Sequence, residues 1–291
     1  MPRTIDEGFR DFLAWLTPTG GESEAARSHR ATVQGCLANN YTLKRFLRIG
    51  SFGNGTSISA FSDVDYLAEV SPANLSSDSN HCLRRLRGFL DYRFPRSEVG
   101  VRCPAVEVPF GTNARNHTEV VLAYDTKKRV GGHIIYGIPN CQGGWMLTAP
   151  DAHKAYVVRE DERLNRRVRP LIRFVKAWKF YRNVPISSFY LEMRVAQYAT
   201  ARASIVYSYD LARFLKGLLD TGLARLQDPV GVSGYVYACD TQVQLDDALS
   251  KLRRAAIRAA DARQCVRSGD YSDAFVWWQL LYKDKFPPYY G

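Results

Sequence analysis

The sequence predicts an α/β (α+β) protein, in which a mixed sheet backed by helices is followed by a mostly helical part. Between residues 43 and 125, short apolar runs typical of strands alternate with an amphipathic helical pattern. After about residue 150 the patterns are helical, with one short interruption. The 291 residues suffice for two lobes, and 46% hydrophobic with 24% charged residues is an ordinary globular composition. We therefore expect one domain over residues 1–150 and a helical domain over residues 151–291.

The first part of the chain shows the elements of the expected sheet in order. Its N-terminus has apolar residues at helical spacing, including Ile5, Phe9 and Phe12, which indicates a helix rather than a signal peptide. The later apolar runs end at Gly, Ser and Asp residues, as strands do. We expect helices over residues 4–16, 21–38 and 78–93, and extended segments over 43–49, 62–70, 98–103, 105–110 and 118–125.

The second part of the chain has helical spacing almost throughout. In "RLNRRVRPLIRFVKAWKFYR", Leu171, Val175 and Trp178 fall on one apolar face. Only "GVSGYVYACD" interrupts the helical patterns, and the tail "FPPYYG" is too rich in Pro for a helix and is expected to be extended and exposed. We expect helices over residues 163–182, 188–201, 208–219, 241–265 and 270–282.

Charge and cysteine content narrow the classes of partner and site. A net charge of +11 favours polyanionic partners such as nucleoside triphosphates or nucleic acid, with simple solubility as the alternative. The six Cys form no CxxC pair and the five His show no ligand spacing, so neither a zinc site nor a disulfide framework is expected. Reduced thiols in a cytoplasmic protein fit this pattern. No run of about 18 apolar residues is present, so no membrane association is expected.

The stretch "IGSFGNGTSISAFSDVDYLAEV" carries the candidate chemistry. Asp63 and Asp65 are two residues apart on an expected strand, so both side chains point to the same face and repel each other. Hard divalent cations relieve such repulsion, and Mg²⁺ is bound by one or two carboxylates together with substrate phosphates. Gly50 and Ser51 allow close approach of a phosphate, and we expect Thr56 near a helix start that favours anions.

The pattern "GSFGNGTSISAFSDVDYL" resembles the signature of the nucleotidyltransferase superfamily, a Gly-Ser followed about a dozen residues later by Asp-x-Asp. In that superfamily a third acid on a neighbouring strand completes the metal site. The segment "HTEVVLAYD" is similar to the third-acid strand, which makes Glu119 the candidate. Glu107 in the preceding strand and Asp125 at the far end of the same strand are the competing candidates.

Later segments resemble one branch, the CD-NTases, which are bacterial relatives of cyclic GMP-AMP synthase and oligoadenylate synthase in antiphage signalling. These segments are "GGHIIYGIPN", "GGWMLTAPDAH", "RPLIRFVKAWK" and "PISSFYLE". The resemblance implies a polymerase β-like nucleotidyltransferase lobe and a helical, oligoadenylate-synthase-like lobe, with the active site in the cleft between them. It implies a cytoplasmic enzyme that makes a cyclic di- or trinucleotide from nucleoside triphosphates.

The same resemblance assigns roles at the acids and the Gly-Ser turn. Asp63 and Asp65 would hold two Mg²⁺ ions, with Mn²⁺ as the alternative metal. Glu119 would complete the metal site and help to activate the acceptor hydroxyl. Gly50, Ser51 and Thr56 would bind the donor nucleotide through its phosphates.

Further nucleotide-binding residues are expected in the later segments. Lys176 would neutralise the triphosphate, and it shares a stripe of about 60° with Arg169 and Arg173, for which a solvated helix face is the alternative. Ser188 would contact phosphate or ribose, or cap the next helix. The remaining expectations are that Phe189 or Tyr190 stacks on a base, with a core position as the alternative, and that Thr148 faces the base and favours purines.

The resemblance also implies partners. The substrates would be ATP, with GTP or a pyrimidine triphosphate as further choices, and a downstream effector would sense the cyclic nucleotide. A conjugation enzyme would act at the C-terminal Gly291, for which a frayed terminus is the alternative. Activation by double-stranded DNA is not expected, because the chain has no zinc-bearing insertion.

Three other functions remain open from the sequence. The nearest is a template-independent RNA polymerase or tRNA-type nucleotidyltransferase that extends an oligonucleotide. The second is a catalytically inactive regulatory protein with the same fold, which the presence of all three candidate acids opposes. The third is a toxin-type or drug-modifying adenylyltransferase, which the CD-NTase-like later segments oppose.

Overall fold

The structure is a computed structural model that describes residues 2–18, 20–59, 61, 63–110 and 116–291, with the side chains of 20–28 and 116 left aside. The chain forms two compact units. The α/β unit consists of residues 18–155 and 230–233, and the helical unit consists of residues 1–17, 156–229 and 234–291. Each unit is described by itself.

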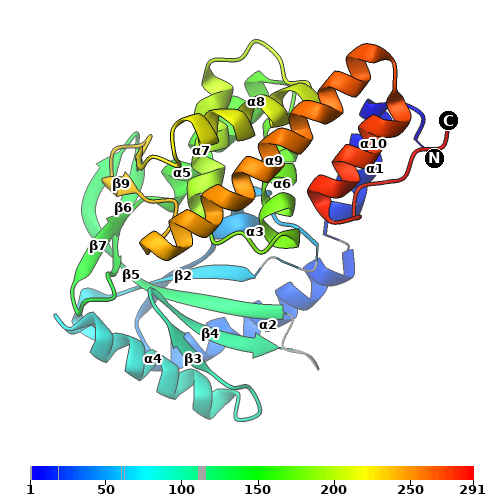
Figure 1. The fold of residues 1–291 in the computed structure, drawn as a ribbon. Helices are drawn as coiled ribbons and strands as arrows, with labels where there is room; N and C mark the ends of the chain where they lie inside the picture. Colours follow the sequence, from blue (N-terminus) through cyan, green and yellow to red (C-terminus); the bar gives the residue numbers. More distant parts are fainter. Residues whose placement is uncertain (1, 19, 60, 62, 111–115) are drawn as a thin grey trace. The chain divides into compact units, whose positions relative to one another are not determined.

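A seven-stranded sheet is the centre of the α/β unit (Figure 1). Its strand order is β1-β2-β5-β4-β3. In addition, β6 pairs with β5, and β7 pairs with β6. Strands β2 and β5 run parallel and the other paired strands run antiparallel, so the predicted mixed sheet is confirmed. The strands are β1 (Leu43–Arg48), β2 (Val64–Val70), β3 (Gly100–Arg102), β4 (Ala105–Phe110), β5 (Asn116–Val130), β6 (His133–Pro139) and β7 (Trp145–Thr148).

Two helices, α2 (Gly20–Asn40) and α4 (Ser79–Arg93), cover one face of this sheet. Side chains alternate along each strand, because successive residues point to opposite faces. Tyr66 and Val120 therefore pack with Leu86 of α4 on the helix-covered face. Leu67 follows Tyr66, and Val121 follows Val120; both belong to a separate cluster on the opposite face.

A short helix, α3 (Gly50–Asn54), directly follows β1. Gly50 has φ +60°, and the helix ends at Gly55, which has φ +71°. Both values lie in the left-handed region that glycine adopts without steric cost. Thr56 thus comes after the helix, and the prediction that it lies near a helix start is wrong. The sequence pattern did not show that Gly50 itself turns the chain into the helix. A 3₁₀ turn, Pro72–Asn74, precedes α4.

The helical unit contains one helix that was not predicted and one that is shorter than predicted. The chain enters this unit through α5 (Pro150–Arg163), and the predicted helix over residues 163–182 begins only at Val168. Asn165 and Arg166 have φ of +54° and +60°, which breaks the helical path. Asp161 then accepts hydrogen bonds from the N–H groups of Val168 (3.0 Å) and Arg169 (2.9 Å), so it caps the new helix.

The other elements of this unit lie within a few residues of their predicted bounds. The helices are α1 (Ile5–Leu16), α6 (Val168–Tyr181), α7 (Ser188–Thr200), α8 (Tyr207–Asp220), α9 (Gln242–Ser268) and α10 (Tyr271–Tyr282). The predicted interruption contains β9 (Tyr235–Val236), which pairs with β8 (Leu226–Gln227), a strand that precedes the interruption. No helix in the described ranges is both long enough and apolar enough to span a bilayer.

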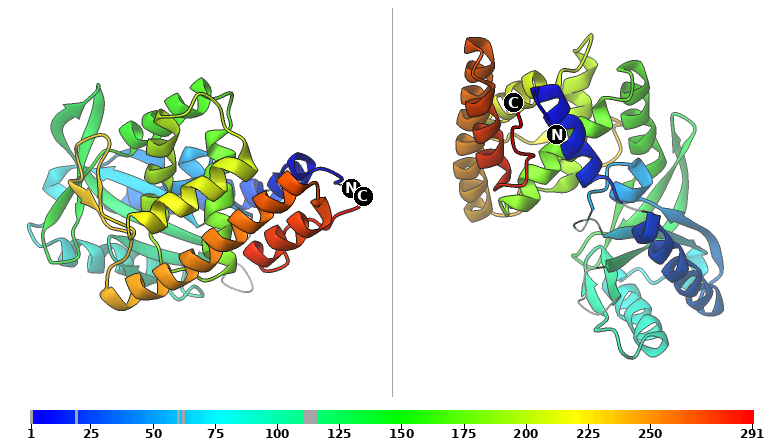
Figure 2. Two further views of the ribbon diagram at one scale, coloured as in Figure 1. Left: turned by 45° about the horizontal axis from the view of Figure 1, so that its top comes forward. Right: turned by 90° about the vertical axis from the view of Figure 1, so that its right-hand side faces the viewer.

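Aromatic side chains join both chain ends to the core of the helical unit. Phe286 of the tail is buried, and its ring centroid lies 5.1 Å from that of Phe9 and 5.3 Å from that of Phe12. The N–H of Tyr290 donates to the carbonyl of Pro2 at 3.1 Å, and Figure 2 shows the two termini together. The tail is extended as predicted, but Phe286 anchors it, and Gly291 at its end is exposed.

A disulfide joins Cys103 to Cys141, with a Cα–Cα distance of 5.6 Å. The expectation of reduced thiols is therefore wrong for this pair. The sequence gives no spacing signal, because the two residues are 38 positions apart. Strand β4 pairs with β5 up to Val120, and β6 pairs with β5 from Tyr124 onward, which brings the β3–β4 turn beside the β6–β7 loop. The free cysteines are Cys36, Cys82, Cys239 and Cys265.

Candidate active site

Three acidic residues form a row across adjacent strands of the α/β unit. Asp65 of β2 pairs in register with Glu119 of β5, and Glu119 pairs in register with Glu107 of β4. Asp63 lies one residue before the start of β2. The topology therefore brings together the Asp-x-Asp and two of the three candidates for a third acid.

All of these acids belong to one face of the sheet. Residues two apart on a strand point to the same face of the sheet. Asp63 and Asp65 are therefore on the same face as Leu67, and Glu119 is on the same face as Val121. Both apolar residues belong to the cluster opposite α2 and α4. The acids therefore stand on the face that these two helices leave uncovered.

Negative charge accumulates around Glu119. Burial raises the pKa of its carboxyl group, and the nearby charges of Asp63 and Glu107 raise it further. The guanidinium of Arg102 and a hydrogen bond with Asp65 oppose these effects without cancelling them. At Glu119, the effects that raise the pKa therefore outweigh those that lower it.

Two residues that the sequence did not single out contact the row. The Nη1 of Arg102 lies 3.5 Å from the Oε1 of Glu107 and 4.0 Å from the Oε1 of Glu119. The Nδ1 of His117 contacts the Oε1 of Glu107. Glu107 thus has two nearby partners, whereas Glu119 shares one of them at a longer distance. A register alignment of the expected hairpin would have placed Arg102 near these acids.

Gly50 is packed against the Asp-x-Asp. A Cβ atom at position 50 would collide with the carboxyl group of Asp65, so the close approach requires glycine. The N–H of Ile49 also donates to the backbone carbonyl of Asp65 at 2.9 Å. The Gly-Ser turn and the Asp-x-Asp strand are therefore fixed to each other.

Ser51 and Thr56 lie at the two ends of the α3 segment. Ser51 is half-buried in the first turn, and Thr56 is fully buried. Thr56 donates to the carbonyl of Ser51 through its N–H at 2.8 Å and through its Oγ1 at 3.4 Å. These contacts make Thr56 a residue that holds Ser51 in place, and its contact with a nucleotide stays a prediction.

The acids suit a divalent cation in their chemistry. Asp63, Asp65 and Glu119 offer only carboxylate oxygens, which are the ligands that Mg²⁺ prefers. Burial, and then the nearby charges of Asp63 and Glu107, raise the pKa of Glu119, and a bound cation would oppose these effects. Within the described ranges, no group of three or more His, Cys, Asp or Glu residues is already arranged to hold a metal ion, so these side chains would adjust on binding.

Asp125 and Thr148 lie in another part of the same sheet. Asp125 pairs in register with Tyr136, which in turn pairs with Thr148. Asp125 is six residues beyond Glu119 on β5, or about 20 Å along a regular strand. Arg129 forms an ion pair with Asp125 at 2.9 Å, and their hydrogen bond lowers the pKa of the Asp125 carboxyl. The structure does not bring Asp125 or Thr148 to the acid row.

The basic stripe of α6 is largely engaged inside the helical unit. Lys176 is 1% exposed, and its Nζ lies 2.8 Å from the Oε1 of Glu192, which is also buried. The Nε of Arg169 lies 3.5 Å from the capping Asp161. Burial lowers the pKa of the half-buried Arg173 guanidinium, and the charge of Arg169 adds to the effect. The Lys176 charge is thus compensated by a buried partner.

The start of α7 presents a different lysine. Ser187 caps α7, because its Oγ accepts from the N–H of Tyr190 at 3.3 Å, so the alternative role of Ser188 as the cap is wrong. Ser188 instead accepts a hydrogen bond from the Nζ of Lys179 at 2.6 Å. Phe189 is half-buried, whereas Tyr190 is fully buried and donates to the carbonyl of Ala224, which makes Tyr190 a core residue.

Comparisons with known proteins identify similar sequences and similar folds. No family model matches the chain. A probable cyclic nucleotide synthase of Bacillus cereus (strain VD146) is 25% identical over 333 aligned positions, which cover 99% of each chain.

Solved structures share the fold. CdnC of E. coli MS115-1 with ATP has a TM-score of 0.74 and 19% identity, covering 97% of this chain and 98% of its own. The CD-NTase CdnG of Bradyrhizobium diazoefficiens with GTP has a TM-score of 0.73 and 13% identity, covering 96% of this chain and 95% of its own. With its mixed sheet, the chain has the nucleotidyltransferase fold of these CD-NTase structures, and it is similar over almost its whole length to a probable cyclic nucleotide synthase.

Proposed function

We propose that this protein joins nucleoside triphosphates into a cyclic di- or trinucleotide, with Mg²⁺ as the metal and a signalling role in antiphage defence. The proposal rests on one observation above all, the register that sets Asp65 beside Glu119 on parallel strands next to Asp63. The similarity to a probable cyclic nucleotide synthase supports the same reaction class.

In this proposal the acids hold the metal and the Gly-Ser turn holds the donor. Asp63, Asp65 and Glu119 bind Mg²⁺, which when bound neutralises charge on the phosphates and lowers the pKa of the attacking hydroxyl. Glu119 is the better third acid because Glu107 already contacts Arg102 and His117. Gly50 leaves room for Asp65, and Ser51 offers its N–H and hydroxyl to the triphosphate.

The reaction is nucleotidyl transfer. A 3′- or 2′-hydroxyl of one nucleotide attacks the α-phosphate of another, its proton leaves, and pyrophosphate is released. A second attack of the same kind closes the ring. The chain contributes orientation and fixed charge, which are the main sources of rate acceleration in phosphoryl chemistry.

The nucleotide-binding residues of the helical unit are proposed with one addition. Lys176, Ser188 and Phe189 keep their predicted roles at triphosphate, phosphate or ribose, and base. Lys179 is a further candidate for the phosphate contact, because it already bonds to Ser188 and is only half-buried. Thr148 stays a proposed base contact.

We also propose the wider assignments that the family suggests. Residues 1–150 would form the nucleotidyltransferase core and residues 151–291 the helical lobe, with residues 1–17 of the first segment packed in the helical unit. The substrates would be ATP together with GTP or a pyrimidine triphosphate. The reaction would take place in the cytoplasm. An effector would sense the product, and a conjugation enzyme would act at Gly291, which is exposed.

The decisive experiment uses the purified full chain. It is incubated with labelled nucleoside triphosphates, Mg²⁺ or Mn²⁺ and phosphatase, and the products are identified by mass spectrometry. We expect a phosphatase-resistant cyclic product without a primer, and none from the D63N/D65N double variant, which should remain folded because it loses two repelling charges. Circular dichroism checks the fold of that variant.

Other outcomes would redirect the assignment. Extension of an added RNA without a cyclic product would favour the oligonucleotide-extending nucleotidyltransferase. Substantial product from D63N/D65N would contradict the metal-site proposal. No metal-dependent consumption of any triphosphate would favour a regulatory protein that has lost catalysis.

A further inference from the structure

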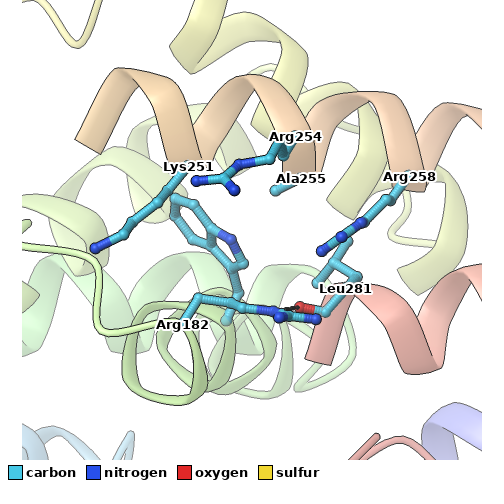
Figure 3. Close-up of a pocket in the computed structure, with 7 residues that line it drawn as sticks. Arg182, Lys251, Arg254, Ala255, Arg258 and Leu281 are labelled. Atoms are coloured by element: carbon cyan, nitrogen blue, oxygen red, sulfur yellow. Dashed lines mark hydrogen bonds between the residues drawn. The ribbon is translucent and has the colours of Figure 1, made fainter. Parts of the chain in front are cut away.

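A basic pocket lies within the helical unit, among three of its helices. Its volume is about 210 Å³. Figure 3 shows Arg254 and Arg258 of α9 on one side of it and Arg182, at the end of α6, on the other, beside Leu281 of α10. The lining consists of four basic residues and three apolar ones, namely Arg182, Lys251, Arg254, Arg258, Trp178, Ala255 and Leu281.

Three of the four basic residues bind helix ends. Arg182 donates from its Nε to the carbonyl of Leu281 at 3.1 Å and also donates to Leu280. Arg258 donates to the Leu280 carbonyl at 2.8 Å. These contacts satisfy carbonyls at the C-terminal end of α10, which a cation also stabilises electrostatically.

Lys251 donates a hydrogen bond just beyond the C-terminal end of α6 in the same way. Its Nζ donates to the carbonyl of Asn183 at 2.8 Å and to the carboxylate of Asp247 at 2.7 Å. Asp247 therefore compensates one charge of the pocket. Helix capping thus accounts for three basic residues, and each arginine among them keeps further N–H donors for a ligand.

Arg254 has no such structural role. It makes no hydrogen bond or ion pair with any residue that the structure describes, and it is exposed at the pocket. Burial, and then the charge of Arg258, lower the pKa of the Arg182 guanidinium, whereas Asp284 raises it. The charge of Arg254 also lowers this pKa, so Arg254 stands close to Arg182. An anion bound among these basic side chains would reduce their mutual repulsion.

We propose that this pocket binds a compact phosphorylated anion, with a diphosphate or triphosphate group seated between Arg254, Arg182 and Arg258. Guanidinium groups match phosphate oxygens through paired N–H donors. The volume is below the range of about 300–1,000 Å³ that is usual for drug-sized ligands, which favours a phosphate chain over a whole nucleotide.

The apolar lining favours a small ligand over a macromolecule. Trp178 is 1% exposed, so it forms a wall of the pocket and does not offer a face for base stacking. A concave site whose charges converge suits a small polyanion, whereas a nucleic-acid backbone is bound by a row of cations spread over a surface. This site goes beyond the proposed function, because none of its residues belongs to the proposed reaction.

Calorimetry on the full chain tests the proposal with inorganic pyrophosphate and tripolyphosphate as the ligands. The titrations contain a chelator, so that metal-dependent binding at the acid row does not contribute. The wild type is compared with R254Q and with R253Q, which removes the same charge from the neighbouring exposed position on α9 outside the pocket lining. Neither arginine forms a hydrogen bond or an ion pair with the part of the chain that the structure describes.

We expect R254Q to raise the Kd at least about tenfold, as the loss of a charge-assisted hydrogen bond does. We expect R253Q to stay within about twofold, as a change in general electrostatics does. The proposal is overturned if neither ligand binds the wild type, or if both variants weaken binding equally. Sulfate binding as tightly as pyrophosphate, or RNA binding that depends on Arg254 without pyrophosphate binding, would overturn it too.

Discussion

The acid row and the Lys176–Glu192 pair show two ways in which this protein holds charge. In the row, like charges are gathered, and Asp63 and Glu107 raise the pKa of Glu119. In the helical unit, one buried cation faces one buried carboxylate at 2.8 Å. Charge compensated within the fold contributes to structure, whereas we propose that the like charges of the row are retained for a metal ion.

This difference predicts opposite responses to mutation. Removing one partner of a buried ion pair leaves an uncompensated charge in a medium of low dielectric constant, which destabilises the fold. Removing one carboxylate from a crowded row relieves repulsion, so stability is kept while metal binding is lost. Mutations at the buried ion pair should therefore lower the free energy of unfolding, whereas mutations in the acid row should lower the turnover rate and keep the free energy of unfolding.

The largest effect is expected for K176M in the helical unit. The free energy of unfolding should fall by about 3–5 kcal/mol, because Glu192 is left buried without its cation. Urea denaturation measures this change. The matched control is K216M, whose partner Asp220 is exposed, as is Lys216 itself, and there the loss should be below about 1 kcal/mol.

The double variant K176M/E192M separates structure from binding. It should recover most of the lost stability, because neither charge remains. If it also recovers synthesis of the product, Lys176 has no role at the triphosphate and Lys179 is the better candidate. A K176M variant as stable as the wild type would contradict the compensated-pair interpretation.

E119Q should show the reverse behaviour. Product formation should fall by about 10²–10³-fold, as for removal of one group that stabilises transition-state charge. A carboxyl whose pKa is raised on folding destabilises the native state at pH values above that pKa, so at neutral pH the variant should be at least as stable as the wild type.

E107Q is the matched control for E119Q, since the two residues are register partners on adjacent strands. It should retain most activity and lose some stability, because Glu107 contacts Arg102 and His117. Steady-state rates and urea midpoints of both variants decide the assignment. Inactive E107Q beside active E119Q would make Glu107 the third acid.

C103S tests whether the covalent link, and not the acids, stabilises the α/β unit. The disulfide closes a long loop, so its loss should lower the free energy of unfolding by about 2–4 kcal/mol. The measurement is urea denaturation in non-reducing buffer, with C265S as the control, because Cys265 is a free thiol of the helical unit. Equal urea midpoints for C103S and the wild type would refute this role.

Local patterns in the sequence predicted much of the fold and the acids. Strand alternation and helical periodicity depend on neighbouring residues, so the mixed sheet and most helices were predicted. The two-residue spacing of Asp63 and Asp65 gave their common face without any knowledge of the partner strand. Glu119 was chosen by resemblance, and the register with Asp65 now gives a geometric reason for that choice.

The misses depend on contacts between distant residues or on backbone angles. The contact of Arg102 with the acids follows from strand register, and the Cys103–Cys141 link follows from where β4 and β6 meet β5. The position of Thr56 depended on the positive φ of Gly50, for which the residue type is permissive but not decisive. A hydrophobic pattern could not show that Lys176 points toward Glu192.

D125N gives the smallest expected effect and marks the limit of the acid row. Asp125 shares β5 with Glu119, but it is paired with Arg129, and the hydrogen bond to Arg129 lowers its pKa. Its loss should change the free energy of unfolding by less than about 1 kcal/mol, as for other surface ion pairs, and leave the rate within about twofold. Rate assays beside E119Q measure the contrast. A strong loss of activity in D125N would mean that the metal-binding region extends along β5, and that compensation by a partner does not by itself separate structural acids from catalytic ones.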